Sequence, residues 1–173
     1  MRLSVLNCPD KDFKPFVKRG AFFYAECLLP SKRLRENINL IIKFNDKLTV
    51  WGFASIEDYN ASNKPREFLI ELHPWIGAKN ILKTLAHEMV HIKQFVNLET
   101  NETLSKWKGT PIDPDKLDYF YHPWEMEAHS LEPALFTKFV IDENLWEVFE
   151  EINNPNDAIE IRDIGWKNSY KKS

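Results

Sequence analysis

The chain has 173 residues, of which 43% are hydrophobic and 28% charged, a composition typical of a globular protein with a sizeable core. Its net charge of -3 argues against a nucleic-acid-binding protein, because such proteins usually carry a basic surplus. No apolar run approaches the roughly 18 residues of a membrane span or the roughly 7–15 of a secretory signal, so we expect a cytoplasmic protein with no nucleic-acid or membrane partner.

The first half of the chain combines one predicted helix with three predicted strands. Helical apolar spacing over residues 12–29 predicts the helix, which Pro30 ends. Short stretches with β-branched or alternating apolar residues predict the strands at 37–44, 50–56 and 66–73, with a loop at 59–65. In the last strand Phe68, Ile70 and Leu72 point to one side, which predicts one buried face.

The second half of the chain is predicted to be helical. A helix over 78–98 is followed by a proline-rich loop at 109–123, and another helix begins near Pro123. Pro133 should kink or interrupt this helix, and a last helix is expected over 142–152. This order of elements predicts an α+β domain, in which a small, mostly antiparallel sheet packs against the helix 78–98 and the helices that follow.

The stretch TLAHEMVHIKQ, residues 84–94, carries two histidines four residues apart, with a glutamate beside the first. On a helix, His87 and His91 lie on one face and can bind one zinc ion per chain. Glu88 is then placed to act as general base toward a metal-bound water. The alternative is a pair of histidines at the rim of a helix packing face, but the intact HExxH spacing on a predicted helix favours the metal site.

A catalytic zinc ion needs a third protein ligand, and the segment YHPWEMEAHSLEPAL, residues 121–135, offers the candidates. Drawn as a helix, it places Glu127 within the apolar arc of Trp124 and Leu131. Because an unpaired carboxylate in such an arc is unfavourable, we predict that Glu127 binds the zinc. Two alternatives stay open, namely an ion pair between Glu127 and a core-facing lysine or arginine, and Glu125 as the ligand.

Three stretches together resemble a known family: the HExxH stretch, WKG at 107–109 and YHPWEMEA at 121–128. They look like the small gluzincin-type zinc metallopeptidases often encoded by bacteriophages, which resemble a minimal thermolysin-like core. The resemblance covers about residues 31–135 and implies a single zincin-like domain over 1–173, with 136–173 as a C-terminal helical segment. A phage-encoded protein of this kind would work in the cytoplasm of the host cell.

The resemblance also implies a role for each residue of the motifs. His87 and His91 would be zinc ligands, Glu88 the catalytic base, and Glu127 the third ligand. Thermolysin-type sites often carry an aspartate four residues after that glutamate, where it orients a histidine. Here Leu131 holds that position, so another group must orient the histidines.

The predicted function is hydrolysis of peptide bonds in a peptide or protein substrate by a zinc-activated water, with Glu88 as general base. Three residues of the loop before the predicted third ligand are candidates for oxyanion or substrate contacts: Tyr119, Tyr121 and His122. Ordinary loop packing also explains them. The strand 66–73 could form a sheet edge that pairs with an extended substrate.

Other classes of protein share parts of this pattern. A non-catalytic zinc-binding regulatory or interaction module has no use for Glu88, and structural zinc usually has four ligands with cysteine among them. Cys8 and Cys27 are isolated in the sequence. A hydrolase of another amide, such as a peptidoglycan cross-link, would need export, and a DNA-linked repair protease would be more basic.

Overall fold

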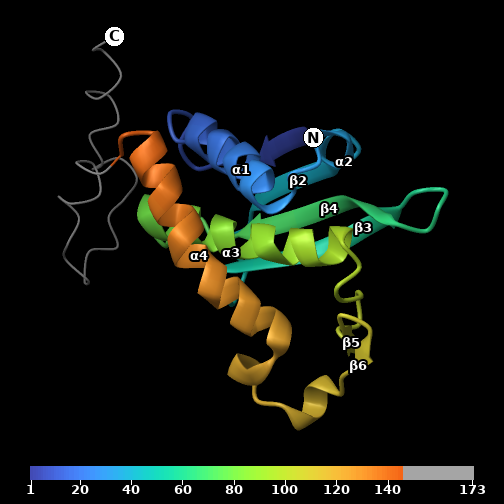
Figure 1. Cartoon of the computed structure of the whole chain (residues 1–173). Coiled ribbons are helices and arrows are strands. Elements are labelled where there is room, and N and C mark those ends of the chain that lie inside the picture. The colour runs from blue at the N-terminus through green and yellow to red at the C-terminus, as the bar shows by residue number, and fades with distance from the viewer. Residues whose placement is uncertain (146–173) are drawn as a thin grey trace.

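The computed structural model describes residues 1–145 (Figure 1). Its strands are β1 (Arg2–Leu6), β2 (Asn39–Phe44), β3 (Gly52–Tyr59), β4 (Pro65–Leu72), β5 (Lys106–Trp107) and β6 (Thr110–Pro111). Its helices are α1 (Lys14–Leu28), α2 (Lys32–Glu36), α3 (Ala78–Val96) and α4 (Pro123–Asp142), with two short 3-10 helices, η1 (Pro114–Lys116) and η2 (Tyr119–Tyr121), before α4. The mixed α+β class is therefore confirmed. Most of the helix predicted at 142–152 lies outside the described residues.

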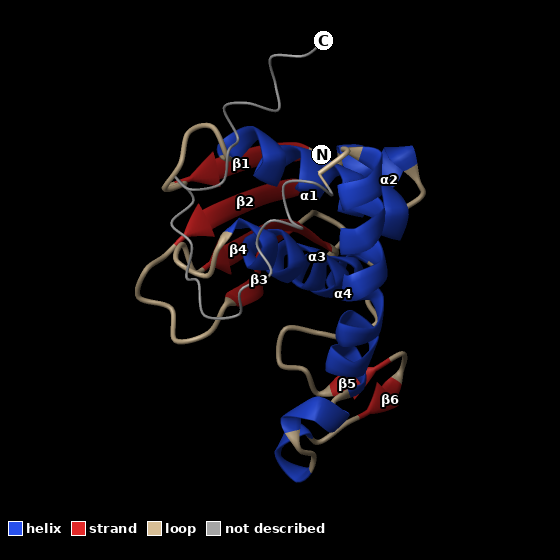
Figure 2. Cartoon of the chain, turned by 90° about the vertical axis from the view of Figure 1, so that its left-hand side faces the viewer, coloured by secondary structure: helices blue, strands red, loops and turns tan. Residues whose placement is uncertain are grey.

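The main sheet has four strands in the order β1-β2-β4-β3 (Figure 2). β1 pairs with β2 and β2 with β4 in parallel, and β3 alone pairs antiparallel, with β4. The prediction of a mostly antiparallel sheet is therefore wrong. One parallel pair arises from β1, which was not predicted as a strand and is joined to β2 by a long connection through α1 and α2. The other arises because β4 lies between β2 and β3, so that β2 pairs with β4 rather than with β3.

The edges of the sheet also differ from the prediction. The strand predicted at 66–73 is β4, which lies between β2 and β3 and is hydrogen-bonded on both sides. Within residues 1–145, the edge strand on that side is β3. A substrate that pairs with the sheet must therefore approach β3 rather than β4.

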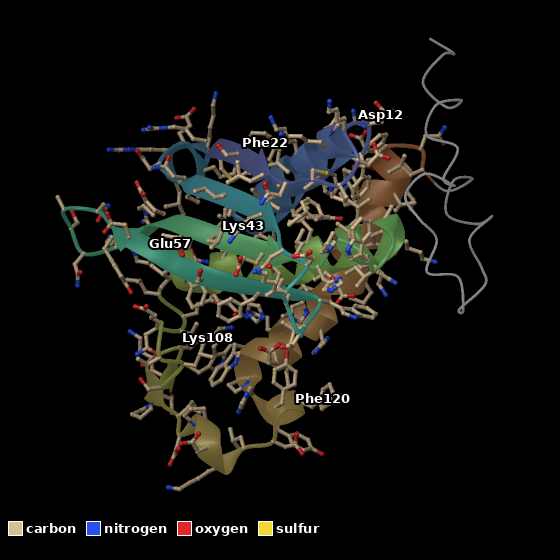
Figure 3. All side chains as sticks on the ribbon, turned by 180° about the vertical axis from the view of Figure 1, so that it is seen from behind. Asp12, Phe22, Lys43, Glu57, Lys108 and Phe120 are labelled. Carbon is tan, nitrogen blue, oxygen red and sulfur yellow. The ribbon has the colours of Figure 1, made fainter. Side chains whose placement is uncertain are left out.

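The buried core lies between the sheet and the helices. α3 contacts β3 and β4 on one side and α1 and α4 on the others (Figure 1). Val5 of β1 and Phe16 and Tyr24 of α1 belong to this core, so the N-terminal elements pack in the same unit as the sheet and α3. Figure 3, seen from behind, shows the sheet in front of α3, with Lys43 on its open face.

Two features of the helices matter for the site. α4 continues past Pro133 to Asp142, so the predicted interruption does not occur. α3 is enclosed by the sheet and by two helices, and its polar residues His87, Glu88 and Gln94 are buried together with its apolar ones. No helix among residues 1–145 combines the length and the apolar composition that a membrane span requires.

Candidate metal centre

Two histidines of α3 face each other at the side of the helix that packs against α4. His87 and His91 are one turn apart, and their Nε2 atoms are 3.2 Å apart. The side chains are 10% and 13% exposed, so they lie beneath the surface rather than in open solvent. The helical spacing of the motif therefore brings the two imidazoles together as predicted.

A carboxylate from the first turn of α4 completes the cluster. Glu125 places Oε2 3.3 Å from His87 Nε2 and Oε1 3.6 Å from His91 Nε2. Ligand bonds of about 2.0–2.1 Å in a tetrahedral site put neighbouring ligand atoms about 3.3 Å apart. The distances from His87 Nε2 to His91 Nε2 and to Glu125 Oε2, 3.2 and 3.3 Å, match that value, and one ligand atom from each of the three residues lies within 4.8 Å of the others, so the residues present fit a zinc ion.

The other ring nitrogens of both histidines have hydrogen-bonding partners. His87 Nδ1 lies 3.3 Å from Glu132 Oε2, and His91 Nδ1 lies 2.9 Å from Gln94 Oε1. Acceptors at these positions favour the tautomer with hydrogen on Nδ1, which leaves Nε2 as a bare lone pair. Two lone pairs 3.2 Å apart repel each other unless a cation or a proton lies between them.

The electrostatics of the cluster favour positive charge at the histidines. Burial lowers the pKa of His87, but the hydrogen bonds with Glu125 and Glu132 outweigh it and raise that pKa to about 9. The pKa of His91 is raised above its ordinary value too, because the contacts with Glu125 and the charge of Glu88 overcome its burial. The carboxylates around the imidazoles thus attract a proton or a metal ion to the same place.

Glu88 lies beside the histidines and is almost completely buried, with 5% of its surface exposed. Burial raises the pKa of its carboxyl group, while the charges of His91 and His87 act in the opposite direction. Its neighbour in the sheet is Gly52 of β3, where an added Cβ would lie 2.7 Å from Glu88 Oε1. The start of β3 therefore lies directly against the predicted general base.

Among the three aromatic loop residues that were candidates for substrate contacts, Tyr119 alone reaches the cluster. Its hydroxyl group donates a hydrogen bond of 2.8 Å to Glu125 Oε2. Tyr121 is 69% exposed, and His122 places Nε2 3.1 Å from the carbonyl oxygen of Pro114 and stacks on Trp124. Tyr119 is thus positioned to orient Glu125 or to donate to a bound substrate.

The predicted third ligand, Glu127, lies elsewhere. Its Oε2 atom accepts hydrogen bonds of 2.9 Å from Lys93 and 3.0 Å from Gln94, and its Oε1 atom accepts one of 3.1 Å from Lys108. The structure therefore does not bring Glu127 to the histidines. It places Glu127 in the ion pair that was the alternative explanation, and it places the second candidate, Glu125, beside the two histidines.

The physical reason is that the polar arc of α4 is the arc that faces the histidines. Glu125, His129 and Glu132 are spaced at i, i+4 and i+7 and share one side of the helix. Glu125 is only 6% exposed, and the His129 ring lies 4.6 Å from the His87 ring. The apolar-arc argument assumed that the polar side of α4 faces solvent, and this assumption does not hold where it meets α3.

Three residues of the site were not predicted from the sequence: Gln94, Glu132 and Gly52. Gln94 lies three residues after His91 and so on the same side of α3, and Glu132 lies two turns after Glu125. Gly52 interrupts a predicted strand, which often marks a close approach by another group. Each of these signals is present in the sequence, but each has meaning only when the partner element is known.

Comparison with known proteins gives no match to a protein-family model, a curated protein or a solved structure. The functional argument therefore rests on the geometry of the cluster. His87, His91 and Glu125 can hold a metal ion, and Glu88 lies beside them as a buried carboxylate. Such an arrangement can bind and polarise a carbonyl group and move a proton at the same place.

Proposed function

We propose that the chain is a zinc-dependent metallopeptidase of gluzincin type with a zincin-like active site. The observation that carries this proposal is the convergence of His87 Nε2, His91 Nε2 and a Glu125 oxygen within 4.8 Å of one another, next to the buried carboxylate of Glu88. The set of two imidazoles and one carboxylate leaves a zinc ion with a net charge of about +1, which suits Lewis-acid chemistry.

Each residue around this centre has a separate role in the proposed reaction. Zinc bound there would polarise a substrate carbonyl and bring the pKa of a coordinated water to about 7. Glu88 accepts the proton of the attacking water and returns it to the departing amine, for which a carboxylate with a raised pKa is suited. Tyr119 is the candidate donor to the negative charge that develops on the carbonyl oxygen.

The shape of the sheet supports an extended peptide as the substrate. β3 is the edge strand nearest the site, and it begins at Gly52, against Glu88. An edge strand offers unpaired backbone groups that can form a ladder with a peptide chain. The large exposed side chains of Trp51 and Phe53 flank Gly52 and would lie along such a substrate.

The decisive experiment compares wild-type protein with Glu88→Gln. The variant should keep one zinc ion per chain by metal analysis, because the ligands are unchanged, and should hydrolyse casein at least about 100-fold more slowly. Glu36→Gln, an exposed residue at the end of α2, is the matched control and should behave as wild type.

The outcomes separate the functional classes. Wild-type protein that binds zinc but hydrolyses no peptide in a diverse library would indicate a non-catalytic zinc-binding module. Hydrolysis that survives in Glu88→Gln would show that Glu88 is not the general base. Wild-type protein that binds no zinc would remove the basis of the proposal.

A further inference from the structure

The side chain of Gln94 is completely buried, with 0% exposed, and all parts of its amide group are engaged. Its Nε2 atom donates hydrogen bonds of 2.9 Å to the carbonyl oxygen of Trp124 and 3.0 Å to Glu127 Oε2. Its Oε1 atom lies 2.9 Å from His91 Nδ1. An amide has two N–H donors and one oxygen acceptor, and this orientation matches each of them to a suitable partner.

The opposite orientation of the amide is excluded by the same neighbours. Rotation by 180° would bring Oε1 of Gln94 against the carbonyl oxygen of Trp124 and a carboxylate oxygen of Glu127. Acceptors would then face acceptors around a fully buried side chain, which is strongly unfavourable. The orientation of the Gln94 amide is thus fixed on the side away from His91, by Trp124 and Glu127.

Two lysines pair with the carboxylate of Glu127. Lys93 Nζ lies 2.9 Å from its Oε2 atom and Lys108 Nζ lies 3.1 Å from its Oε1 atom. A carboxylate paired with two ammonium groups accepts hydrogen bonds, so it requires the NH2 group of Gln94.

We propose that Glu127 and Gln94 are positioning residues that set the tautomer of His91. Glu127 fixes the amide of Gln94, the amide oxygen requires a hydrogen on His91 Nδ1, and His91 Nε2 is thereby left free to bind the metal. The inference rests on the proposed zinc site and assigns a role to the glutamate that sequence reasoning took for a ligand. His87 differs, because Glu132 contacts its Nδ1 atom directly.

The first test is Gln94→Met, which keeps the length of the side chain and removes its hydrogen bonds. The zinc affinity of the purified full-length protein, measured by competition with a chromophoric chelator, should fall about 10- to 100-fold. In the zinc-loaded wild-type protein, nitrogen-15 NMR should show His91 with its hydrogen on Nδ1. In the variant that hydrogen should exchange faster with water, a change that a general loss of stability would not produce at one histidine.

Three variants at two glutamates test the chain of contacts from Glu127 through Gln94 to His91, called the relay below. Glu127→Leu should weaken zinc binding, because it frees the amide of Gln94. Glu127→Gln should restore most of the affinity, because its amide oxygen can still accept from Gln94, whereas a true carboxylate ligand would not be replaced in this way. Glu99→Gln is the matched control: Glu99 pairs with the same Lys93 at 2.8 Å but does not contact Gln94, so zinc affinity should stay unchanged.

Each result decides the question. Zinc affinity of Gln94→Met within about twofold of wild type, at full wild-type activity, overturns the relay and leaves the proposed function intact. Wild-type protein without zinc affinity overturns both. If Gln94→Met fails to fold, the comparison of Glu127→Leu with Glu127→Gln tests the proposal instead. The Glu127 side chain is 20% exposed and therefore tolerates replacement better than Gln94. Equal loss of zinc in both of these variants would contradict the relay.

Discussion

Gly52 is the residue whose replacement tests the packing of the site most directly. In Gly52→Ala the added Cβ would lie 2.5 Å from Thr84 Cγ2 and 2.7 Å from Glu88 Oε1. The backbone of Gly52 is outside the positive-φ region, so the effect comes from lack of space and not from the conformation of the chain. Thr84 and Glu88 are both buried on α3 and have little room to move.

The expected magnitude follows from these distances. Forcing an extra methyl group into a well-packed place should lower the free energy of unfolding by about 1–3 kcal/mol. Because Glu88 must move to relieve the contact, peptide hydrolysis should fall about 100-fold, as it does when a catalytic group is displaced by about 1 Å. The atoms nearest to the new methyl group belong to Thr84 and Glu88 and not to His87, His91 or Glu125, so zinc affinity should change little.

Gly20→Ala provides the matched control. Its added Cβ would lie 3.5 Å from side-chain atoms of Leu82 and Tyr24, which is ordinary van der Waals contact, and an alanine inside α1 should stabilise the protein by about 0.5–1 kcal/mol. Urea unfolding of the metal-free proteins, followed by tryptophan fluorescence, measures both effects. A Gly52→Ala variant with wild-type unfolding free energy and wild-type hydrolysis would refute the close packing of β3 against Glu88.

Three further predictions concern the metal centre. Glu125→Ala should lose zinc in a metal analysis, whereas Glu127→Ala should keep a measurable zinc site of reduced affinity; complete loss of zinc in Glu127→Ala alone would restore Glu127 as the ligand. In the metal-free protein the pKa of His87 is raised to about 9, so protons compete with zinc below that pH, and chelator competition should show zinc affinity falling by up to about tenfold for each unit of pH. The same raised pKa stabilises the metal-free fold below pH about 6.5, and this contribution should be lost as the pH rises through about 9 in urea unfolding series. Tyr119→Phe removes the hydrogen bond of 2.8 Å to Glu125 and should weaken zinc binding about tenfold or more in the same assay; unchanged affinity would limit Tyr119 to contacts with substrate.

Local patterns in the sequence were sufficient for most of the individual elements. The helical spacing at 12–29 and 78–98 and the apolar runs at 37–44, 50–56 and 66–73 correspond to α1, α3 and β2 to β4. β1 was missed because it has five residues and buries only Val5. Such a strand has little periodicity of its own and is stabilised by its partner.

The arrangement of the strands was not predictable from these patterns. β1 pairs with residues 39–43, and β2 pairs with residues 67–72, so both parallel ladders join segments that are far apart in the chain. Hydrophobic periodicity indicates which face of a strand is buried, but it does not identify the neighbouring strand. The sequence therefore predicts the class of the fold and not the direction of its strands.

For a related reason Glu127 was expected beside the histidines, where the structure places Glu125. A helical wheel gives the angle between Glu125 and Glu127, but it does not say which arc meets α3. The alternative that stayed open, an ion pair with a core-facing lysine, is the one that forms: Lys93, next to Gln94 on α3, reaches Glu127 at 2.9 Å. A lysine with a long aliphatic stem can cross an apolar surface and neutralise such a carboxylate.

The charges around the histidines indicate why so polar a cluster can be buried. Burial raises the pKa of Glu125, but hydrogen bonds from His87 and His91 hold that pKa well below its ordinary value, so the carboxylate stays ionised and requires positive charge beside it. In the metal-free protein a proton between the two Nε2 atoms supplies that charge, and a divalent cation in the same place would supply more of it without disturbing the Nδ1 contacts. A buried imidazolium ion also needs an acceptor at each nitrogen, so the contacts of the Nδ1 atoms with Glu132 and Gln94 suit both states. The spacing of the Nε2 atoms distinguishes them: two protonated nitrogens 3.2 Å apart would repel each other, so one cation shared by both imidazoles favours a metal centre over two buried salt bridges.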